Sequence, residues 1–257
     1  MSRTPFIAGN WKLNKTIAEA EQYIAALLPQ VSDTEGVDVA ICPSFIALQP
    51  MVDSSRGSRV GVFAQNMHEA DSGPYTGEVS APMLTEIDVD GVVLGHSERR
   101  QYFGETDRAL QQKVPRALEA GLVPILCVGE TEEERERGDT QRRLRHQVQE
   151  GLDKVPIERL GEVVVAYEPV WAIGTGLTPD AEQAQEAVSF VRALVEGFDK
   201  AGAQAVRILY GGSLKSDNAE ELLALPDVDG ALVGGASLDP LEFARIVQIA
   251  AGLVAAP

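Results

Sequence analysis

The sequence predicts an α/β protein in which eight parallel strands close into a (β/α)8 barrel with helices outside. Eight short apolar runs recur along the chain, and apolar residues at helical spacing lie between them. Polar residues do not alternate cleanly within the runs, so each strand is expected to be buried on both faces. Eight strands can close a barrel. Periodicity alone leaves an open, doubly wound sheet as an alternative, although no GxGxxG motif follows the first run.

The predicted strands follow one another at regular intervals. They cover residues 6–10, 37–42, 60–65, 90–95, 122–128, 162–168, 205–211 and 229–235. No proline-, serine- or glycine-rich linker divides the chain, so we expect one domain over residues 1–257. Barrels of this length commonly form one domain.

Three helices are predicted from apolar stripes or terminal signals. Residues 17–31 carry a stripe, and Thr16 with Glu19 matches a capping box in front of it. A short helix is expected over 96–102, directly after the fourth strand. Asp239 and the proline that follows it open a last helix.

Two further helices carry less regular signals. A stripe over residues 184–198 predicts a helix that the Thr-Pro pair at 178–179 opens. The pattern over 105–120 contains Pro115, which removes a backbone donor and crowds the preceding turn. We therefore predict a kink or a break near residues 111–115.

Two polar segments and two histidines complete the pattern. Residues 66–78 form a long connection of the kind that is functional or disordered. The charge run over 131–139 is expected to be the solvated face of a helix. His68 and His146 lie in polar surroundings and are expected at the surface.

Composition and charge exclude several functional classes. The net charge of −17 and the pI near 4.6 argue against nucleic acid and anionic membranes as partners. No 18-residue apolar stretch predicts a membrane span. The two cysteines, Cys42 and Cys127, have no metal-ligand spacing, so we expect free, buried thiols in a reducing compartment, the cytoplasm.

Chemically active residues follow the predicted strands. Asn10 and Lys12 end the first strand, His96 follows the fourth, and Glu168 ends the sixth. Glycine-rich turns follow the seventh and eighth. Because function in a barrel collects at the carboxyl ends of the strands, these groups are expected to share one face.

The motifs at these ends resemble the triosephosphate isomerase family. The matching blocks are GNWKLN (9–14), AQN (64–66), YTGE (75–78), LGHSERR (94–100), CVGE (127–130), AYEPVWAIGTG (166–176), YGGS (210–213) and LVGGASL (232–238). They span the chain in the family's order. The resemblance implies a TIM barrel that interconverts dihydroxyacetone phosphate and glyceraldehyde 3-phosphate through an enediol(ate), in glycolysis and gluconeogenesis.

The resemblance also implies roles for four catalytic residues. Glu168 aligns with the base that moves a proton between adjacent carbons. His96 aligns with the electrophile that polarises the carbonyl, as a neutral imidazole; this family is the standard case of that arrangement. Lys12 aligns with the cation that offsets negative charge, and Asn10 with a donor to a substrate oxygen, although a turn role for Asn10 is equally compatible.

Phosphate binding would depend on backbone amides, because the sequence has no basic cluster. Gly174, Ser213, Gly234 and Gly235 align with the family's phosphate-binding positions, and a short helix near Gly235 would direct its N-terminus at the dianion. Glu98, Ser97 and Cys127 match family positions that lie behind the residues in contact with substrate.

The resemblance further implies a mobile lid and a homodimer without cofactors. Residues 169–179 resemble the lid, and 66–78 resembles the dimerisation loop, with Thr76 reaching the partner subunit. Pro74 and Tyr75 depart from the family pattern, which affects assembly rather than chemistry. A metal-dependent epimerase would need several His and Asp ligands at strand ends, and only His96 qualifies. A non-catalytic phosphate-binding protein on the same barrel remains the alternative function.

Overall fold

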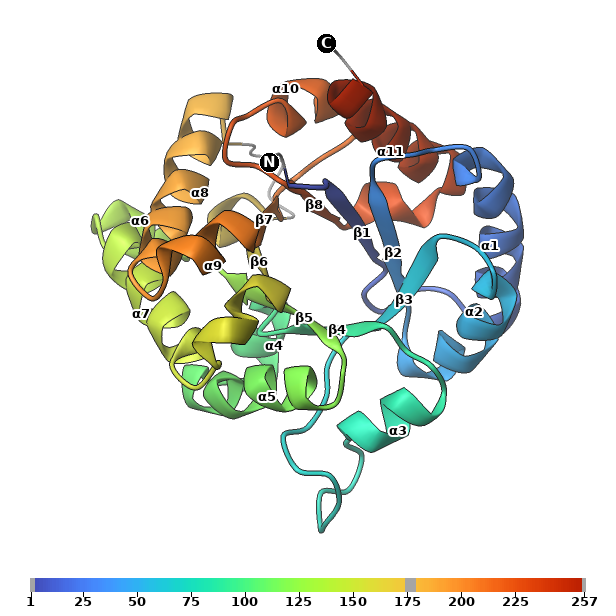
Figure 1. Cartoon of the computed structure of the whole chain (residues 1–257), viewed down its shortest axis with the longest axis horizontal. Coiled ribbons are helices and arrows are strands. Elements are labelled where there is room, and N and C mark those ends of the chain that lie inside the picture. The colour runs from blue at the N-terminus through green and yellow to red at the C-terminus, as the bar shows by residue number, and fades with distance from the viewer. Residues whose placement is uncertain (1–2, 174–178, 256–257) are drawn as a thin grey trace.

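Eight parallel strands form the closed barrel that the sequence predicts. The computed structural model describes residues 3–173 and 179–255. Each strand pairs with its neighbours along the chain, and β1 pairs with β8 to close the ring (Figure 1). The strands are β1 (Phe6–Asn10), β2 (Asp38–Cys42), β3 (Val60–Ala64), β4 (Gly91–Leu94), β5 (Val123–Val128), β6 (Val164–Tyr167), β7 (Arg207–Tyr210) and β8 (Gly230–Val233).

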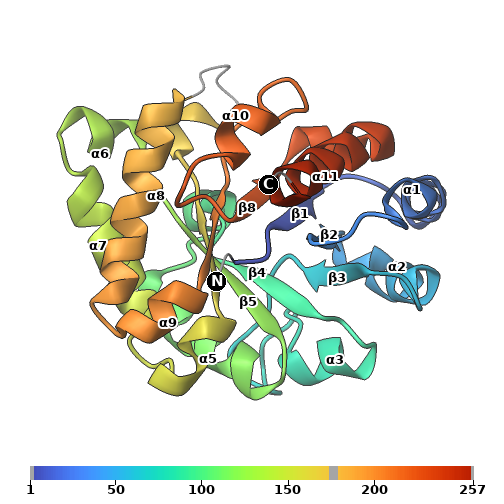
Figure 2. The ribbon, with the colours of Figure 1, turned by 45° about the horizontal axis from the view of Figure 1, so that its top comes forward.

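Helices surround the strands in chain order. They are α1 (Ile17–Val31), α2 (Leu48–Ser55), α3 (Ala81–Glu86), α4 (Ser97–Tyr102), α5 (Asp107–Glu119), α6 (Glu132–Glu136), α7 (Thr140–Leu152), α8 (Ala181–Glu196), α9 (Lys200–Ala205), α10 (Ala219–Leu223) and α11 (Pro240–Ala255). Short 3-10 helices are η1 (Phe45–Ala47), η2 (Ile157–Glu162), η3 (Val170–Ala172) and η4 (Gly235–Leu238). Figure 2 places α1, α2 and α11 on one side of the strands and α6, α7 and α8 on the other. None of the helices in the described residues is long and apolar enough to cross a membrane.

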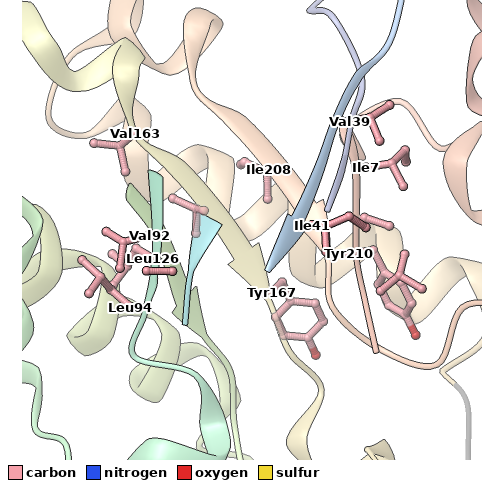
Figure 3. Close-up of a cluster of buried hydrophobic side chains, with 14 of the residues drawn as sticks. Ile7, Val39, Ile41, Val92, Leu94, Leu126, Val163, Tyr167, Ile208 and Tyr210 are labelled. Atoms are coloured by element: carbon pink, nitrogen blue, oxygen red, sulfur yellow. The ribbon is translucent and has the colours of Figure 1, made fainter. Parts of the chain in front are cut away.

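The core has two layers because each strand buries both of its faces. In β1, Phe6 and Ala8 belong to the cluster inside the barrel. Ile7 belongs to the cluster between strands and helices, part of which is drawn in Figure 3. This double burial explains why polar residues do not alternate in the strand sequences. Cys42 and Cys127 lie in the inner cluster as free, buried thiols, as predicted.

Several predicted local signals are confirmed. Thr16 and Glu19 form the capping box of α1, with the Glu19 amide donating to the Thr16 hydroxyl at 3.4 Å. Asp239 accepts hydrogen bonds from the first amides of α11. The charge run includes α6, which has no buried residue and carries an ion pair of 2.5 Å between Glu133 and Arg137.

Two predictions about helices are wrong in their details. The prediction near 111–115 was a kink or a break, and the break does not occur: α5 is continuous through Pro115, and its buried residues on both sides of the proline pack into the core. Helix α8 begins at Ala181 and not at 178–179. Asp180 is its cap, because the Asp180 carboxylate accepts from the Gln183 amide at 2.8 Å and Gln183 completes a capping box.

The segment 66–78 contains no helix or strand and projects beyond the ring of helices (Figure 1). Its base is closed by a hydrogen bond from the His68 amide to the Val79 carbonyl. His68 itself is not a surface residue as predicted: its side chain is 16% exposed, because its ring stacks on Tyr75 with centroids 4.0 Å apart. His146 is exposed, as predicted.

Candidate active site

A cavity of about 720 Å³ opens at the carboxyl ends of the strands. It brings together most of the residues that the sequence singled out, from five different strand ends. These are Asn10, Lys12, His96, Ser97, Glu98, Glu168, Ser213, Gly234 and Gly235. Cys127 does not line the cavity, because its thiol faces the interior of the barrel. Gly174 lies outside the described residues.

Glu168 is the most buried carboxylate of this cavity. Only 2% of the residue is exposed, and Oε1 lies 2.8 Å from Nε2 of His96. Oε2 accepts a hydrogen bond of 2.8 Å from the backbone N–H of Ser97. Ser97 therefore acts on Glu168 through its backbone, which a sequence motif cannot distinguish from a side-chain role.

The two buried groups shift one another's pKa values. Burial raises the pKa of Glu168, but the charge and hydrogen bond of His96, together with the Ser97 amide, outweigh burial and lower that pKa below its ordinary value. Burial lowers the pKa of His96, but the charge and hydrogen bond of Glu168 raise it above its ordinary value. The carboxylate and the imidazole thus stabilise one another's charged forms.

A second contact on the imidazole favours the neutral form. His96 is the N-cap of α4, and its Nδ1 accepts a hydrogen bond of 3.3 Å from the Glu98 amide. A protonated Nδ1 cannot accept this bond. The two hydrogen bonds together fit a ring that carries its proton on Nε2 and donates it to Glu168.

Lys12 has a backbone conformation that residues other than glycine seldom adopt. Its φ of 53° lies in the left-handed region, which costs about 1–2 kcal/mol for a residue with a Cβ atom. Asn10 accepts from the Lys12 amide at 3.1 Å, and Gln65 donates to the Lys12 carbonyl at 3.0 Å. The Lys12 ammonium reaches Glu98 at 2.6 Å. The turn role of Asn10 is therefore observed, and strain of this kind often marks a functional position.

Small residues bring the strand ends close to Glu168. A Cβ atom at Gly129 would lie 1.7 Å from the Glu168 carbonyl oxygen, and one at Gly211 would lie 3.0 Å from its Cγ atom. Opposite these turns, Gly234 precedes the 3-10 helix η4, as the sequence predicts. The Ser237 hydroxyl donates to the Gly234 carbonyl at 2.7 Å, which fixes the start of η4 at the cavity.

A buried cluster at the start of the predicted lid was not expected from the sequence. Glu130 is fully buried, and its Oε1 accepts from the Tyr167 hydroxyl at 3.1 Å and from the Trp171 indole at 2.9 Å. Arg135 stacks over the Trp171 ring at 4.2 Å. Burial raises the pKa of Glu130. Glu130 follows the fifth strand by two residues within the CVGE block, and the charge run over 131–139 directly after it was predicted to be a solvated helix face.

A second missed network supports the turn that carries His96. Glu105 accepts from the Gly95 amide at 3.2 Å and forms a buried ion pair with Lys113, which also donates to Asn66 at 3.0 Å. Arg100 donates to the Gly95 carbonyl at 2.7 Å. No sequence pattern reveals these contacts, because they join residues from three separate loops and helices.

Known proteins match this chain along almost its whole length. The family model described as Triosephosphate isomerase matches residues 5–250. A triosephosphate isomerase of Carboxydothermus hydrogenoformans is 53% identical over 96% of this chain and 98% of its own. Those of Symbiobacterium thermophilum and Moorella thermoacetica are 50% and 49% identical, over 97% and 96% of this chain and 98% of each relative. The chain therefore belongs to the triosephosphate isomerase family.

Proposed function

We propose that this chain interconverts dihydroxyacetone phosphate and glyceraldehyde 3-phosphate by moving one proton through an enediol(ate) intermediate. The observation that carries the proposal is the pair of Glu168 and His96. Both are buried in one cavity, and Lys12 lines the same cavity. A carboxylate, an imidazole and a cation in one cavity supply the base, the proton donor and the charge that the reaction needs.

Glu168 is the base in this proposal. Its carboxylate removes a proton from the carbon next to the carbonyl and returns it to the neighbouring carbon. The carboxylate is engaged by His96 and by the Ser97 amide. Substrate binding must therefore replace these two hydrogen bonds before the carboxylate reaches the reacting carbons.

His96, Lys12 and Asn10 stabilise the negative charge that develops on substrate oxygens. When Glu168 leaves His96, the group that raises the pKa of the imidazole is removed, and neutral His96 can donate its Nε2–H to the substrate carbonyl. Glu98 donates its amide to Nδ1 and keeps this tautomer oriented. The Asn10 amide nitrogen donates to a second substrate oxygen, while its Oδ1 holds the turn.

The phosphate group is bound by backbone amides near Ser213, Gly234 and Gly235, with Gly174 on the lid. The first three line the cavity at adjacent strand ends. The resemblance assigns a lid to 169–179, of which residues 174–178 lie outside the described part of the chain; in this proposal the lid excludes water, which protects the intermediate from loss of phosphate. Glu130 and the aromatic residues that donate to it support the start of that lid. This chemistry requires neither a metal nor another cofactor.

The proposed assembly is a cytoplasmic homodimer formed through the loop 66–78. The loop projects from the barrel, and its tip, including Thr76, is exposed. Exposed apolar side chains lie in and beside it, namely Tyr75 and Met83. Such a set is typical of a surface that a partner covers. Free, buried cysteines suit a reducing compartment.

The activity is tested by coupled assays of both reaction directions, with a chelator present, for the native chain and for Glu168→Asp. This change retracts the carboxylate by one methylene and keeps its charge, so we expect a loss of about 100-fold or more in kcat. The exposed Glu158→Asp is the matched control and should retain full activity.

Three outcomes separate the alternatives. Chelator-resistant turnover that falls only in Glu168→Asp supports the isomerase and its base. No turnover by the native chain would favour a non-catalytic phosphate-binding protein. Equal turnover by native and Glu168→Asp proteins would keep the reaction but remove Glu168 as its base.

A further inference from the structure

The candidate cavity contains a positively charged side chain that has no role in the proposed catalysis. Lys215, which follows the glycine-rich turn after β7, lines the same cavity as Lys12. The acidic residues of the lining are Glu98 and Glu168. With His96 neutral, two lysines balance two carboxylates, and without Lys215 the lining would carry a net negative charge.

Lys12 is only partly available to an incoming anion. Its ammonium already lies 2.6 Å from the carboxylate of Glu98, so their charges largely cancel at a distance. Lys215 is exposed, and no ion pair to it occurs within residues 3–173 and 179–255. The uncompensated positive charge among the described residues of the cavity therefore belongs to Lys215.

The backbone around Lys215 is fixed, although its side chain is free. The Lys215 amide donates to Asn218 at 2.8 Å, and Asn218 donates to the Ser213 carbonyl at 3.2 Å. Ser216 donates from both its amide and its hydroxyl to Glu242, at 2.8 and 3.0 Å. These bonds tie the turn to α10 and α11 and hold the lysine at the mouth of the cavity.

Its place in the fold puts Lys215 on the phosphate side of the cavity. It lies two residues beyond Ser213, and the glycines that begin η4 lie across the same opening. The whole chain carries a net charge of −17, so a phosphate dianion approaches against an unfavourable field. A local cation at the opening reverses that field where the substrate enters.

We propose that Lys215 guides the phosphate dianion into the cavity and partly neutralises it there. The inference rests on the proposed isomerase function and adds a substrate-guiding residue to it. Lys215 does not reach the reacting carbons in this proposal. Its contribution therefore concerns capture of the substrate, and it falls as salt screens the charge.

The test compares Lys215→Gln and Lys215→Glu with the same changes at Lys154, an exposed lysine beyond the end of α7. We expect kcat/KM for glyceraldehyde 3-phosphate to fall about threefold to tenfold in Lys215→Glu at low ionic strength. The loss should be smaller in Lys215→Gln and should shrink in high salt. Lys215→Arg retains the charge and should restore native values.

Two readouts separate guidance from a structural role. Turnover of glyceraldehyde, which lacks the phosphate, should be equal in native and Lys215→Gln proteins. Inorganic phosphate, measured by calorimetry as a competing dianion, should bind at least about threefold more weakly to Lys215→Gln than to Lys154→Gln. A structural defect would instead lower turnover of both substrates.

The inference is overturned if the Lys215 and Lys154 variants have the same kcat/KM, salt dependence and phosphate affinity. It is also overturned if glyceraldehyde turnover falls as much as that of the phosphorylated substrate. A native chain without isomerase activity defeats the proposed function instead. In that case phosphate binding by the lysine variants still decides whether Lys215 attracts the dianion.

Discussion

The two ends of the barrel use charged residues in different ways. At the amino ends of the strands, Arg192 pairs with Asp227 at 2.8 Å and with Asp229 at 2.5 Å. Asp229 also pairs with Arg3 and accepts from the Ile208 amide. At the carboxyl ends, the carboxylate of Glu168 depends on His96 and one backbone amide, both of which face the cavity.

This difference separates stability from function within one fold. At the amino ends of the strands, which we call the lower end, the charged groups are already paired with partners from the chain itself, so a ligand would add no stabilising contact there. At the carboxyl ends, which we call the upper end, the charged groups make contacts that a substrate can replace. Lys12 has a strained backbone conformation beside them. Changes at the lower end should therefore unfold the protein, whereas changes at the upper end should inactivate a folded protein.

The largest effect is expected for Lys12→Gly. Removing the cation should lower kcat/KM about 100- to 1000-fold, the usual cost of losing one group that stabilises developing negative charge. Glycine adopts a φ of 53° freely, so stability should stay unchanged or rise by up to about 1 kcal/mol. Urea unfolding and steady-state kinetics measure the two quantities separately.

Lys15→Gly is the matched control for that change, because Lys15 has a φ of 68°. Its ammonium donates to the Leu238 carbonyl at 2.9 Å and lies over the rings of Trp11 and Tyr23. Here we expect a stability loss of about 1 kcal/mol and activity within a few-fold of native. Equal loss of activity in both variants would contradict a specific role for Lys12.

The second prediction concerns Arg192→Ala at the lower end. Removing the guanidinium leaves Asp229 buried with less compensation, so the free energy of unfolding should fall by about 3–5 kcal/mol. The pair of Arg159 and Glu162 at the surface supplies the control, since Arg159→Ala should leave the free energy of unfolding nearly unchanged. Denaturant unfolding measures both, and kcat per folded molecule should remain native in both. A loss of kcat in folded Arg192→Ala would break the proposed separation of the two ends.

The third prediction uses pH to isolate the upper pair. The lowered pKa of Glu168 contributes stability that is present above its ordinary pKa of 4.5 and is lost as pH falls through the folded pKa. The raised pKa of His96 contributes stability that is full below 6.5 and is lost as pH rises through the folded pKa. The native protein should therefore exceed His96→Gln in stability most between about pH 4.5 and 6.5. A difference that does not change from pH 5 to pH 9 would remove the ion pair as its source.

Much of the fold was predictable because local and global signals agree. The apolar runs locate all eight strands to within two residues, since a strand buried on both faces must be apolar throughout. Pro115 shows a limit of local signals, because α5 continues through it with buried residues on both sides, and the helix does not break there. At α8, the better cap two residues later replaced the predicted one.

The residues of the site were predictable where a single reactive side chain follows a single strand. Glu168, His96 and Lys12 meet because parallel strands bring their carboxyl ends together. The Glu105–Lys113 pair and the position of Lys215 were not predictable, since each depends on how separate loops approach one another. Sequence therefore identifies groups that strands position, and it misses those that the packing of loops and helices positions.

The smallest predicted effect tests whether the burial of the charges, rather than their location in the barrel, sets the strength of the ion pairs at the lower end. Arg207 pairs with Asp38 at 2.5 Å near the same end, but the Asp38 side chain is 57% exposed. Arg207 also lies over the Phe6 ring at 4.8 Å. We expect Arg207→Met to cost at most about 1 kcal/mol, and the loss should shrink in 1 M salt, which screens exposed charges. The loss in Arg192→Ala should persist in the same salt, because its partners are shielded from solvent. Equal salt dependence in the two variants would mean that position at the barrel end, and not burial, sets the strength of these ion pairs.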